Sequence, residues 1–470
     1  MSERIPAQIV ETVEPRPPRR TPAPAGGAIH TRSFTGRYRS LRLYGAGLLF
    51  LLFFGTAWLN WNGRQAVLWD LGGRQFYIFG ATFWPQDFIL LSALLIICAF
   101  GLFAITVAAG RVWCGYACPQ SVWTWAFMWA EKVAEGDRNQ RLKLDAAPWS
   151  AAKLARRGAK HGLWLAMSLA TAIAFVGYFT PVRALVHDLV TLQLDSTTAF
   201  WLFFFGAATY ANAGWLREKV CRDMCPYSRF QSVMFDPDTL IVSYDAARGE
   251  RRGPRRKDAE PKAGGLGDCI DCTLCVQVCP TGIDIRDGLQ LLCIGCGACV
   301  DACDGVMDKM GYARGLVRYG SERELAGGRT RWLRPRLVGY ASALLLMIGA
   351  FVWALAARPL VSLDVTRDRG LYRENGAGQI ENIYRLKVIN KTQQPHRYAI
   401  SLAEPGPFVL QGASELRLAP GEVLDVPVSV ALSEGRAQQS ATPLDFAVAD
   451  LDDPEVTVSA RSTFVAPLER

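Results

Sequence analysis

Eight cysteines between residues 269 and 303 form two runs with the spacing that bacterial two-cluster ferredoxins use. The first run is Cys269–Cys279 and the second is Cys293–Cys303, with two, two and three residues between successive cysteines. Three thiolates of such a run bind one four-iron cube, and the fourth thiolate ligates the other cube. The spacing therefore predicts two [4Fe–4S] clusters. Cluster A is expected to use Cys269, Cys272, Cys275 and Cys303, and cluster B is expected to use Cys293, Cys296, Cys299 and Cys279.

Zinc is the alternative metal for closely spaced cysteines. A structural zinc ion needs four ligands and has no use for two interleaved runs of this spacing, so the pattern favours iron–sulfur clusters. Gly295 and Gly297 should let the second loop fold tightly around its cluster. The two runs differ after their last cysteine, where Pro280 follows the first run and Asp304 follows the second.

Four further cysteines form two copies of a C-x3-C-P motif. The copies are Cys114–Pro119 and Cys221–Pro226, and each follows an apolar stretch. Residues i and i+4 of a helix share one face, so each pair is expected to chelate, and the two pairs together would make a four-thiolate pocket. Soft thiolates favour Cu(I), zinc or a further iron–sulfur cluster, and a dithiol redox pair is another alternative. The predicted metal ligands are Cys114, Cys118, Cys221 and Cys225.

Long apolar stretches must position these motifs at a membrane. Half of the 470 residues are hydrophobic, and five stretches approach the ~20 residues that a spanning helix needs. The predicted spans are residues 43–59, 88–109, 162–179, 197–215 and 337–356. The shorter apolar stretch at 121–132 is predicted to be an interfacial or re-entrant helix, and a sixth span is the alternative. Cys98, in the second span, is predicted to be a buried small hydrophobic residue.

The distribution of Lys and Arg predicts the orientation of the spans. Cations crowd the N-terminal tail, the loop at 110–161 and the segments on both sides of the cluster cysteines, whereas the loops at 60–87 and 180–196 carry only three arginines. By the positive-inside rule, the tail and the ferredoxin segment are cytoplasmic. With five spans, the C-terminal domain then lies in the periplasm, outside a bacterial inner membrane. The net charge of +9 is therefore read as a topology signal and not as a nucleic-acid-binding surface.

The chain is predicted to be a multidomain membrane protein. After residue 358, alternating residues at 380–388 and six other short segments separated by turn residues predict an immunoglobulin-like antiparallel β-sandwich. The predicted parts are a disordered tail at 1–40, a four-span helical domain at 41–230, a linker and α+β ferredoxin domain at 231–336 with its core at 260–310, a fifth span at 337–357 and the sandwich at 358–470.

The cysteine motifs together resemble the CcoG/FixG/RdxA family of membrane polyferredoxins. The resemblance rests on Cys114–Gln120, Cys221–Tyr227, Cys269–Ile285 and Cys293–Met310, and it extends from the first span to the sandwich. It implies an accessory protein for the assembly of cbb-type haem–copper cytochrome c oxidase, and a cupric reductase activity that supplies Cu(I). The implied partners are copper ions, a cytosolic electron donor, and oxidase assembly factors, oxidase subunits or a copper-transporting ATPase.

Two other functions use the same residues differently. An electron-feeding membrane ferredoxin would pass electrons to a periplasmic reductase. A non-catalytic assembly scaffold or redox sensor would use its clusters for structure or sensing. The cysteine spacing by itself predicts electron transfer and does not distinguish among these destinations.

Overall fold

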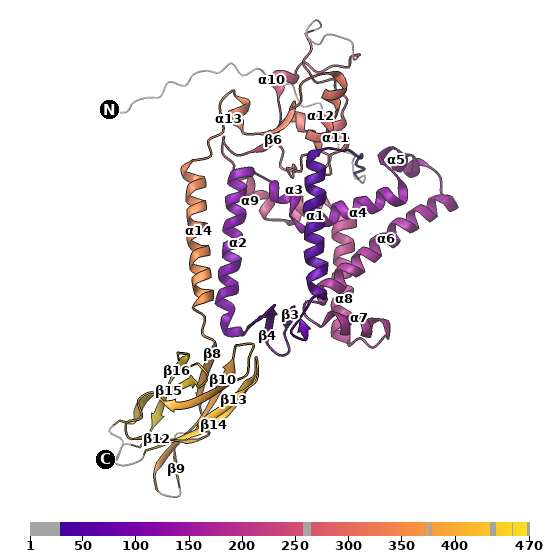
Figure 1. Ribbon diagram of the computed structural model, residues 1–470. Helices are drawn as coiled ribbons and strands as arrows, with labels where there is room; N and C mark the ends of the chain where they lie inside the picture. The colour runs from indigo at the N-terminus through magenta and orange to yellow at the C-terminus, as the bar shows by residue number, and fades with distance from the viewer. Residues whose placement is uncertain are drawn as a thin grey trace, which may run out of the picture. The chain divides into compact units, whose positions relative to one another are not determined.

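The computed structural model describes residues 29–256, 265–370, 372–375, 378–432, 439–453 and 455–467. The chain divides into two compact units (Figure 1). The first unit comprises Met1–Phe54, Ile97–Phe175 and Leu194–Leu345. The second unit comprises Gly55–Ile96, Val176–Gln193 and Leu346–Arg470. All twelve cysteines of the four motifs belong to the first unit.

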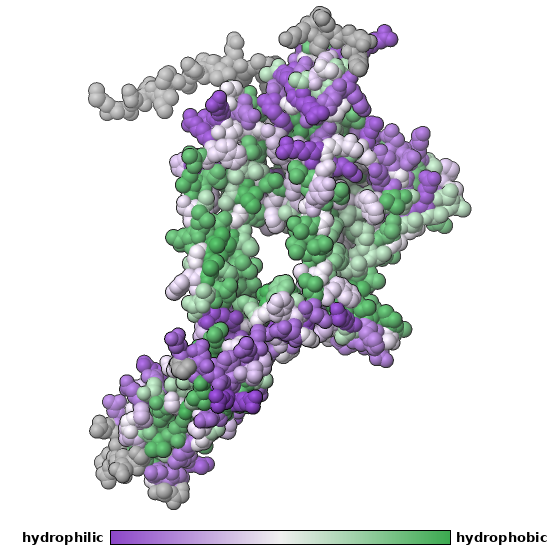
Figure 2. Space-filling view, viewed as in Figure 1, coloured by the Kyte–Doolittle hydropathy of each residue, from purple (hydrophilic) through white to green (hydrophobic). Residues whose placement is uncertain are grey.

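Four helices in the described part of the chain are long and apolar enough to cross a membrane. They are α1 (Arg37–Gly55), α2 (Phe88–Ala109), α6 (Ala151–Val176) and α14 (Pro335–Ala356). In α2 and α14, no residue of the most apolar stretch is buried, as expected for helices that face lipid. Figure 2 shows hydrophobic side chains along both of these helices.

The remaining predicted span, at 197–215, is divided between two helical segments. α8 covers Ser196–Thr209, and the π-helical segment η3 follows it at Tyr210–Leu216. Asp195 begins α8 by accepting a hydrogen bond from the backbone N–H of Thr198. Neither segment alone has the length that a bilayer requires, so this span stays a prediction.

Shorter helices connect the spans. They are α3 (Val112–Tyr116), α4 (Pro119–Glu135), α5 (Arg138–Ala146), α7 (Val182–Val190) and α9 (Tyr227–Val233). α4 contains the stretch predicted to be interfacial, and its two carboxylates, Glu131 and Glu135, are buried. Glu131 accepts hydrogen bonds from Arg141 of α5 (2.5 Å) and from Arg217, and Glu135 accepts one from Arg157 of α6 (2.8 Å). These paired charges fix α4 to its neighbours.

The ferredoxin segment is closed by a two-stranded antiparallel sheet. β6 (Ile241–Tyr244) precedes the cysteine runs and pairs with β7 (Val317–Gly320), which follows them. Two helices, α11 (Leu274–Gln277) and α12 (Ala298–Met310), each begin inside a cysteine run. Five of the eight cysteines, Cys269, Cys275, Cys293, Cys299 and Cys303, share one hydrophobic core with these elements. Its buried aliphatic members are Val242, Ile285, Val300, Val306, Met307, Leu316 and Val317.

The predicted disordered tail at 1–40 is only partly described. Residues 1–28 lie outside the described residues, but the chain from residue 29 onward is bonded to the first unit. The backbone N–H of Arg32 donates to the carbonyl of Gln277 (2.8 Å), and that of Ser33 donates to Asp137 (3.0 Å). Because α1 already begins at Arg37, the boundary predicted at residue 40 is too late.

The C-terminal domain is an antiparallel β-sandwich. Its strands are β8 (Val361–Arg367), β9 (Arg373–Glu374), β10 (Ile380–Asn390), β11 (His396–Leu402), β12 (Phe408–Gly412), β13 (Glu415–Leu418), β14 (Val423–Leu432), β15 (Ala441–Asp450) and β16 (Thr457–Val465). One sheet has the order β12-β14-β10-β8, with β9 paired to β10, and the other has the order β13-β11-β15-β16. Tyr384, Tyr398 and Phe446 fill the core between the sheets. The sequence pattern missed β9 and β12, which are short and lie beside turns.

In the second unit, the segment after α1 is joined to the sandwich by charge. This segment forms β1 (Asn60–Trp61), β2 (Arg64–Gln65), β3 (Val67–Asp70), β4 (Gln75–Ile78) and β5 (Ala81–Phe83). Asp87, which follows β5 and is largely buried, accepts hydrogen bonds from Arg358 (2.8 Å) and Lys391 (3.1 Å). These buried ion pairs tie the loop before α2 to the sandwich.

Candidate functional site

Two cavities in the ferredoxin segment gather the eight cysteines in the predicted sets. The first cavity, of about 20 Å³, is lined by Cys269, Cys272, Cys275 and Cys303. The second, also about 20 Å³, is lined by Cys279, Cys293, Cys296 and Cys299, and Cys275 reaches its wall as well. The last cysteine of each run thus lies with the first three of the other run, as two interleaved clusters require. The ligand assignment itself stays a prediction.

The two cysteine loops follow the same unusual backbone path. Gly295 and Gly297 in the second loop have φ of +62° and +69°, a conformation that glycine adopts without strain. At the matching positions of the first loop, Asp271 and Thr273 have φ of +53° and +57°. Left-handed backbone is rare for a β-branched residue such as Thr273. The sequence suggested a role for the glycines only, and their counterparts in the first loop were missed.

The cysteine thiols of these cavities suit a metal cluster and are poorly suited to being free anions. Burial raises the pKa of Cys275, Cys293 and Cys303 to about 12, and neighbouring thiols add to the shift for Cys293 and Cys303. A thiolate at such a site needs a compensating cation, which iron provides. The donor set therefore fits the predicted clusters.

Arg286 is a cation at the first cavity that the sequence pattern did not reveal. Its side chain is 6% exposed, lines the cavity, and donates hydrogen bonds to Asp284 (2.6 Å) and to Asp271. The hydrogen bond to Asp284 raises the pKa of Arg286, so this side chain stays charged. A buried positive charge at this position opposes the negative charge of four thiolates.

The C-x3-C-P motifs do not lie on continuous helices. Cys114 belongs to α3, whereas Cys118 is extended and precedes α4. Cys221 belongs to the π-helical segment η4 (Val220–Met224), and Cys225 after it is again extended. The predicted i, i+4 arrangement on one helix face is therefore wrong. The reason is the proline after each second cysteine, which disfavours helical backbone in the residue before it.

The four thiols of these motifs nevertheless lie near one another. Burial, together with the neighbouring thiols of Cys118 and Cys221, raises the pKa of Cys114 to about 12. Burial, together with the neighbouring thiols of Cys118 and Cys225, raises the pKa of Cys221 to about 11. In the described part of the chain, no three of these sulfur atoms converge within 4.8 Å of one another. The group is thus a loose cluster of thiols and not a closed three-thiolate site.

The first C-x3-C-P motif touches the loop of the second cavity. A Cβ atom placed on Gly115 would lie 2.9 Å from the carbonyl oxygens of Ile294 and Gly295, and 3.0 Å from Cα of Cys296. The hydroxyl of Tyr116 donates to the carbonyl of Cys296 (3.3 Å). Only a residue without a side chain leaves room for this backbone contact, which brings the two cysteine sites together.

Arg111 binds both sites from a buried position. Its guanidinium is 7% exposed and donates to the carbonyl oxygens of Cys293 (3.2 Å) and Ser228 (2.6 Å). The Ser228 hydroxyl lies 2.6 Å and 2.9 Å from the carbonyl oxygens of Cys221 and Cys225. One cation therefore links the second C-x3-C-P motif to the loop of the second cavity.

Gln231 extends this link to the first motif. It is fully buried, and its side-chain amide lies 3.8 Å from Sγ of Cys114. With its oxygen toward Arg111, the amide accepts a hydrogen bond from Nε (2.8 Å). Burial lowers the pKa of Arg111, and the nearby thiols of Cys114 and Cys293 oppose that shift. Neither residue was predicted from the sequence, because neither belongs to a cysteine motif.

Two other candidate positions carry less chemistry. Cys98 is exposed on α2, so its predicted burial is wrong: an apolar residue of a spanning helix can face lipid. In the sandwich, the ligand atoms of His396, Asp450 and Asp452 lie within 4.8 Å of one another. Nδ1 of His396 lies 2.6 Å from Asp450, and Arg397 pairs with Asp452 (2.9 Å), so nearby basic side chains already engage both carboxylates.

Comparison with known proteins identifies the family. Residues 216–322 match the profile of a 4Fe-4S dicluster domain, residues 91–124 that of a 4Fe-4S binding domain, and residues 351–467 that of the IG-like fold at the C-terminus of FixG. The nitrogen fixation protein FixG of Rhizobium meliloti is 38% identical over 416 residues, covering 80% of this chain and 79% of that protein. The chain belongs to the FixG/RdxA family.

Other FixG/RdxA relatives match to a similar extent. Protein RdxA of Cereibacter sphaeroides is 38% identical over 418 residues, 85% of this chain and 86% of RdxA. Protein RdxB of the same organism is 39% identical over 422 residues, 86% of this chain and 87% of RdxB. The crystal structure of a FixG-related protein from Vibrio parahaemolyticus, 31% identical, aligns over 24% of this chain and all of that chain, with a TM-score of 0.22.

These matches confirm the family that the cysteine motifs resembled, the iron–sulfur character of the ferredoxin segment and the immunoglobulin-like C-terminal domain. Together with the four apolar helices, they identify a membrane-associated iron–sulfur protein of the FixG/RdxA family. The 4Fe-4S binding profile at 91–124 contains Cys114 and Cys118, so it overlaps the first C-x3-C-P motif.

Proposed function

We propose that this protein is a membrane-bound electron-transfer protein that reduces Cu(II) to Cu(I) beside its C-x3-C-P thiols, for the copper centre of a cbb-type cytochrome c oxidase. The observation that supports this proposal best is the backbone contact of Gly115 with the loop of Ile294 and Gly295. Bound at the two cysteine-lined cavities, [4Fe–4S] clusters supply one-electron transfer. The contact holds the first C-x3-C-P motif against the loop of one of these cavities, which is where the proposed copper ligands would receive an electron.

The residues around the C-x3-C-P motifs each have a part in this proposal. Cys114, Cys118, Cys221 and Cys225 are the proposed ligands of the copper substrate, and their thiols lose protons as the metal binds. Cu(II) takes up one electron and leaves as Cu(I), the oxidation state that thiolates prefer. Arg111 and Ser228 hold the second motif against the cluster loop. The electron donor is proposed to be cytosolic, and the receivers of Cu(I) to be a copper-transporting ATPase or oxidase assembly factors.

A Cu(II) reduction assay tests this function. The full-length protein is purified without oxygen, reduced, freed of reductant and mixed with Cu(II) and a chromogenic Cu(I) chelator. The double variant Cys221→Ser/Cys225→Ser should lose most of the rate while keeping the iron of the two ferredoxin clusters. Cys98→Ser is the matched control, because Cys98 is an exposed cysteine outside all four motifs. Equal rates in the wild-type protein and the double variant would refute the proposal.

A second candidate function is electron feeding through a third cluster at the C-x3-C-P thiols. Two observations favour it: the 4Fe-4S binding profile covers Cys114 and Cys118, and no three of the described motif sulfurs converge on a single-ion site. A periplasmic reductase would then be the acceptor. Iron analysis distinguishes the candidates, because this one requires three clusters per chain, and Cys118→Ser should remove one of them without affecting the other two.

The proposed topology places the tail and the ferredoxin segment in the cytoplasm and the sandwich in the periplasm. The loops with few cations, at 60–87 and 180–193, belong to the same compact unit as the sandwich, whereas the cation-rich loop at 110–161 belongs to the other unit. This division agrees with the positive-inside rule. A reporter enzyme that is active only in the periplasm, fused after residue 470, should be active. An inactive fusion of a stably inserted protein would reverse the assignment of the sandwich.

A further inference from the structure

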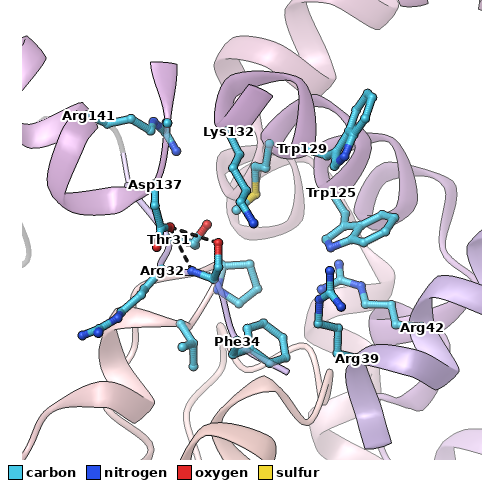
Figure 3. A pocket seen from close by; sticks show the side chains of 15 residues that line it. Thr31, Arg32, Phe34, Arg39, Arg42, Trp125, Trp129, Lys132, Asp137 and Arg141 are labelled. Atoms are coloured by element: carbon cyan, nitrogen blue, oxygen red, sulfur yellow. Dashed lines mark hydrogen bonds between the residues drawn. The ribbon is translucent and has the colours of Figure 1, made fainter. Parts of the chain in front are cut away.

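A basic cavity lies between the N-terminal segment, the start of α1, and helices α4 and α5 (Figure 3). Its volume is about 90 Å³, several times the roughly 10–15 Å³ that one water molecule requires. Its lining includes five cations and one carboxylate. These are Arg32, Arg39, Arg42, Lys132, Arg141 and Asp137.

Two of the charged side chains are already paired within the fold. Arg141 donates to Glu131 (2.5 Å). Asp137 accepts hydrogen bonds from the backbone N–H and the hydroxyl of Ser33 (3.0 and 3.1 Å), drawn as dashed lines in Figure 3, and it also caps α5. The other four cations have no ion-pair partner among the residues that the structure describes. Ser33 is uncharged, so the carboxylate of Asp137 still offsets one of these four cations, and Lys132 interacts with it. The cavity is left with a net positive charge from its lining residues.

Arg42 is the cation of this cavity that most favours a bound anion. Its side chain is buried at 5% exposure, and its Nε has no hydrogen-bond partner in the described part of the protein. One Nη donates to the carbonyl of Ser121 (3.3 Å), and the guanidinium lies 5.9 Å from the ring centroid of Trp125. The thiol of Cys296, a predicted cluster ligand, interacts electrostatically with this cation. No carboxylate among the described residues pairs with Arg42, so an anion beside its free Nε would stabilise the buried charge.

We propose that this cavity binds the phosphate group of an anionic phospholipid. Arg39 and Arg42 lie in the first turns of α1, a spanning helix, which is the depth at which lipid headgroups lie. Trp129 beside them is 56% exposed, as an interfacial tryptophan would be. The planar guanidinium matches phosphate oxygens, and Lys132, which reaches toward the cavity from α4 in Figure 3, adds a point charge.

The position of the cavity gives the phosphate a structural role. Val278 and Pro280 form part of its wall, and they flank Cys279, the cysteine that crosses from the first run to the second cavity. A bound headgroup would therefore hold the N-terminal segment, α1 and α4 against a cluster loop. This role is independent of the proposed copper chemistry, so either proposal can fail without the other.

Lipid retention by the full-length, cluster-loaded protein tests the site. The protein is placed in nanodiscs of phosphatidylcholine with graded amounts of phosphatidylglycerol, and the apparent affinity is read from the thermal midpoint and from lipid retained in native mass spectrometry. The test variant is Arg39→Gln/Lys132→Gln, which leaves the buried Arg42 in place. The matched control is Lys143→Gln/Arg156→Gln, which removes two exposed cations of α5 and α6 that do not line the cavity.

We expect the test variant to bind phosphatidylglycerol at least about tenfold more weakly than the wild type, since each lost charge-assisted hydrogen bond is worth about a factor of ten. The control should bind like the wild type, and Arg39→Lys/Lys132→Arg should restore binding. In phosphatidylcholine alone, inorganic phosphate is added as a second arm. Protection by phosphate, lost in the test variant, would support the site with a soluble phosphate as its ligand. Equal losses in test and control variants, or no response to either ligand, would overturn the proposal.

Discussion

Replacing Gly115 with alanine should separate the two cysteine sites. The added Cβ would lie 2.9 to 3.0 Å from three backbone atoms of the second cluster loop, so the loop or α3 must shift by several tenths of an ångström. Backbone atoms cannot rotate away as a side chain can. Overpacking of this kind costs about 1–3 kcal/mol. The higher helix propensity of alanine stabilises the folded state by at most about 1 kcal/mol. The net effect of Gly115→Ala is therefore destabilising.

The matched control for this substitution is Gly305→Ala. Gly305 lies in α12 of the same ferredoxin segment and is exposed, and a Cβ atom there meets nothing within 4 Å. It receives the gain in helix propensity without the clash. The two variants should therefore differ in stability by about 1–3 kcal/mol, in favour of Gly305→Ala. Thermal unfolding curves of both variants, recorded under anaerobic conditions, give the two midpoint temperatures, and that of Gly305→Ala should be the higher.

Spectroscopy and turnover then show whether the contact matters for function. In Gly115→Ala, the electron paramagnetic resonance signal of the cluster in the second cavity should change, and Cu(II) reduction should slow. The cluster in the first cavity should keep its signal, and Gly305→Ala should keep both signals and the rate. If Gly115→Ala matches Gly305→Ala in midpoint, spectrum and rate, the contact between the motif and the loop is not as described.

Four further predictions follow from the charges and the core. Arg111→Gln removes a buried cation and should make the reduction potential of the cluster in the second cavity more negative, because the reduced cluster loses a favourable charge. A redox titration measures this shift, and an unchanged potential would contradict the prediction. Glu131→Gln leaves two buried arginines without their shared carboxylate and should cost about 3–5 kcal/mol, whereas the exposed Glu322→Gln should leave the thermal midpoint unchanged. Removal of iron should abolish the calorimetric transition of the ferredoxin segment and leave that of the sandwich, which has a core of its own. Hydrogen bonding to Arg323 holds the pKa of Asp238 at about 2 in the folded protein. The pair therefore stabilises the fold fully above about pH 4, the pKa of an aspartate in the unfolded chain, and weakens only as the pH falls toward 2. The destabilisation by Asp238→Asn should thus be the same at pH 6 and pH 8.

The grouping of the ferredoxin cysteines was predictable because it is encoded locally. Spacings of two, two and three residues determine how a short loop can surround a cluster, and the interleaving of Cys279 and Cys303 follows from the same rule. The contact of Gly115 with the second loop was not predictable, because it joins segments about 180 residues apart. The same holds for Arg111 and for the basic cavity, whose walls come from the tail, α4 and the loop after Cys279.

Two predictions failed where a local rule was misapplied. The C-x3-C-P cysteines were expected on one helix face, but the proline after Cys118 and after Cys225 already indicated extended backbone at both positions. Cys98 was expected to be buried because it is apolar and lies in the middle of a span. In a bilayer, however, lipid replaces the protein core as the apolar surroundings, so composition does not indicate which face of a spanning helix is buried.

The side of the membrane on which the sandwich lies depends on the segment Ser196–Leu216. α8 has 14 residues and η3 has 7. At 1.5 Å per residue the two segments together reach about 30 Å, the thickness of the hydrocarbon core. Four spans would place both ends of the chain on one side, and a fifth would place them on opposite sides. The segment is followed by Arg217, Lys219 and Arg222 and is preceded by a loop with a single arginine. That asymmetry is what the positive-inside rule requires of a span that ends in the cytoplasm, and it favours five spans.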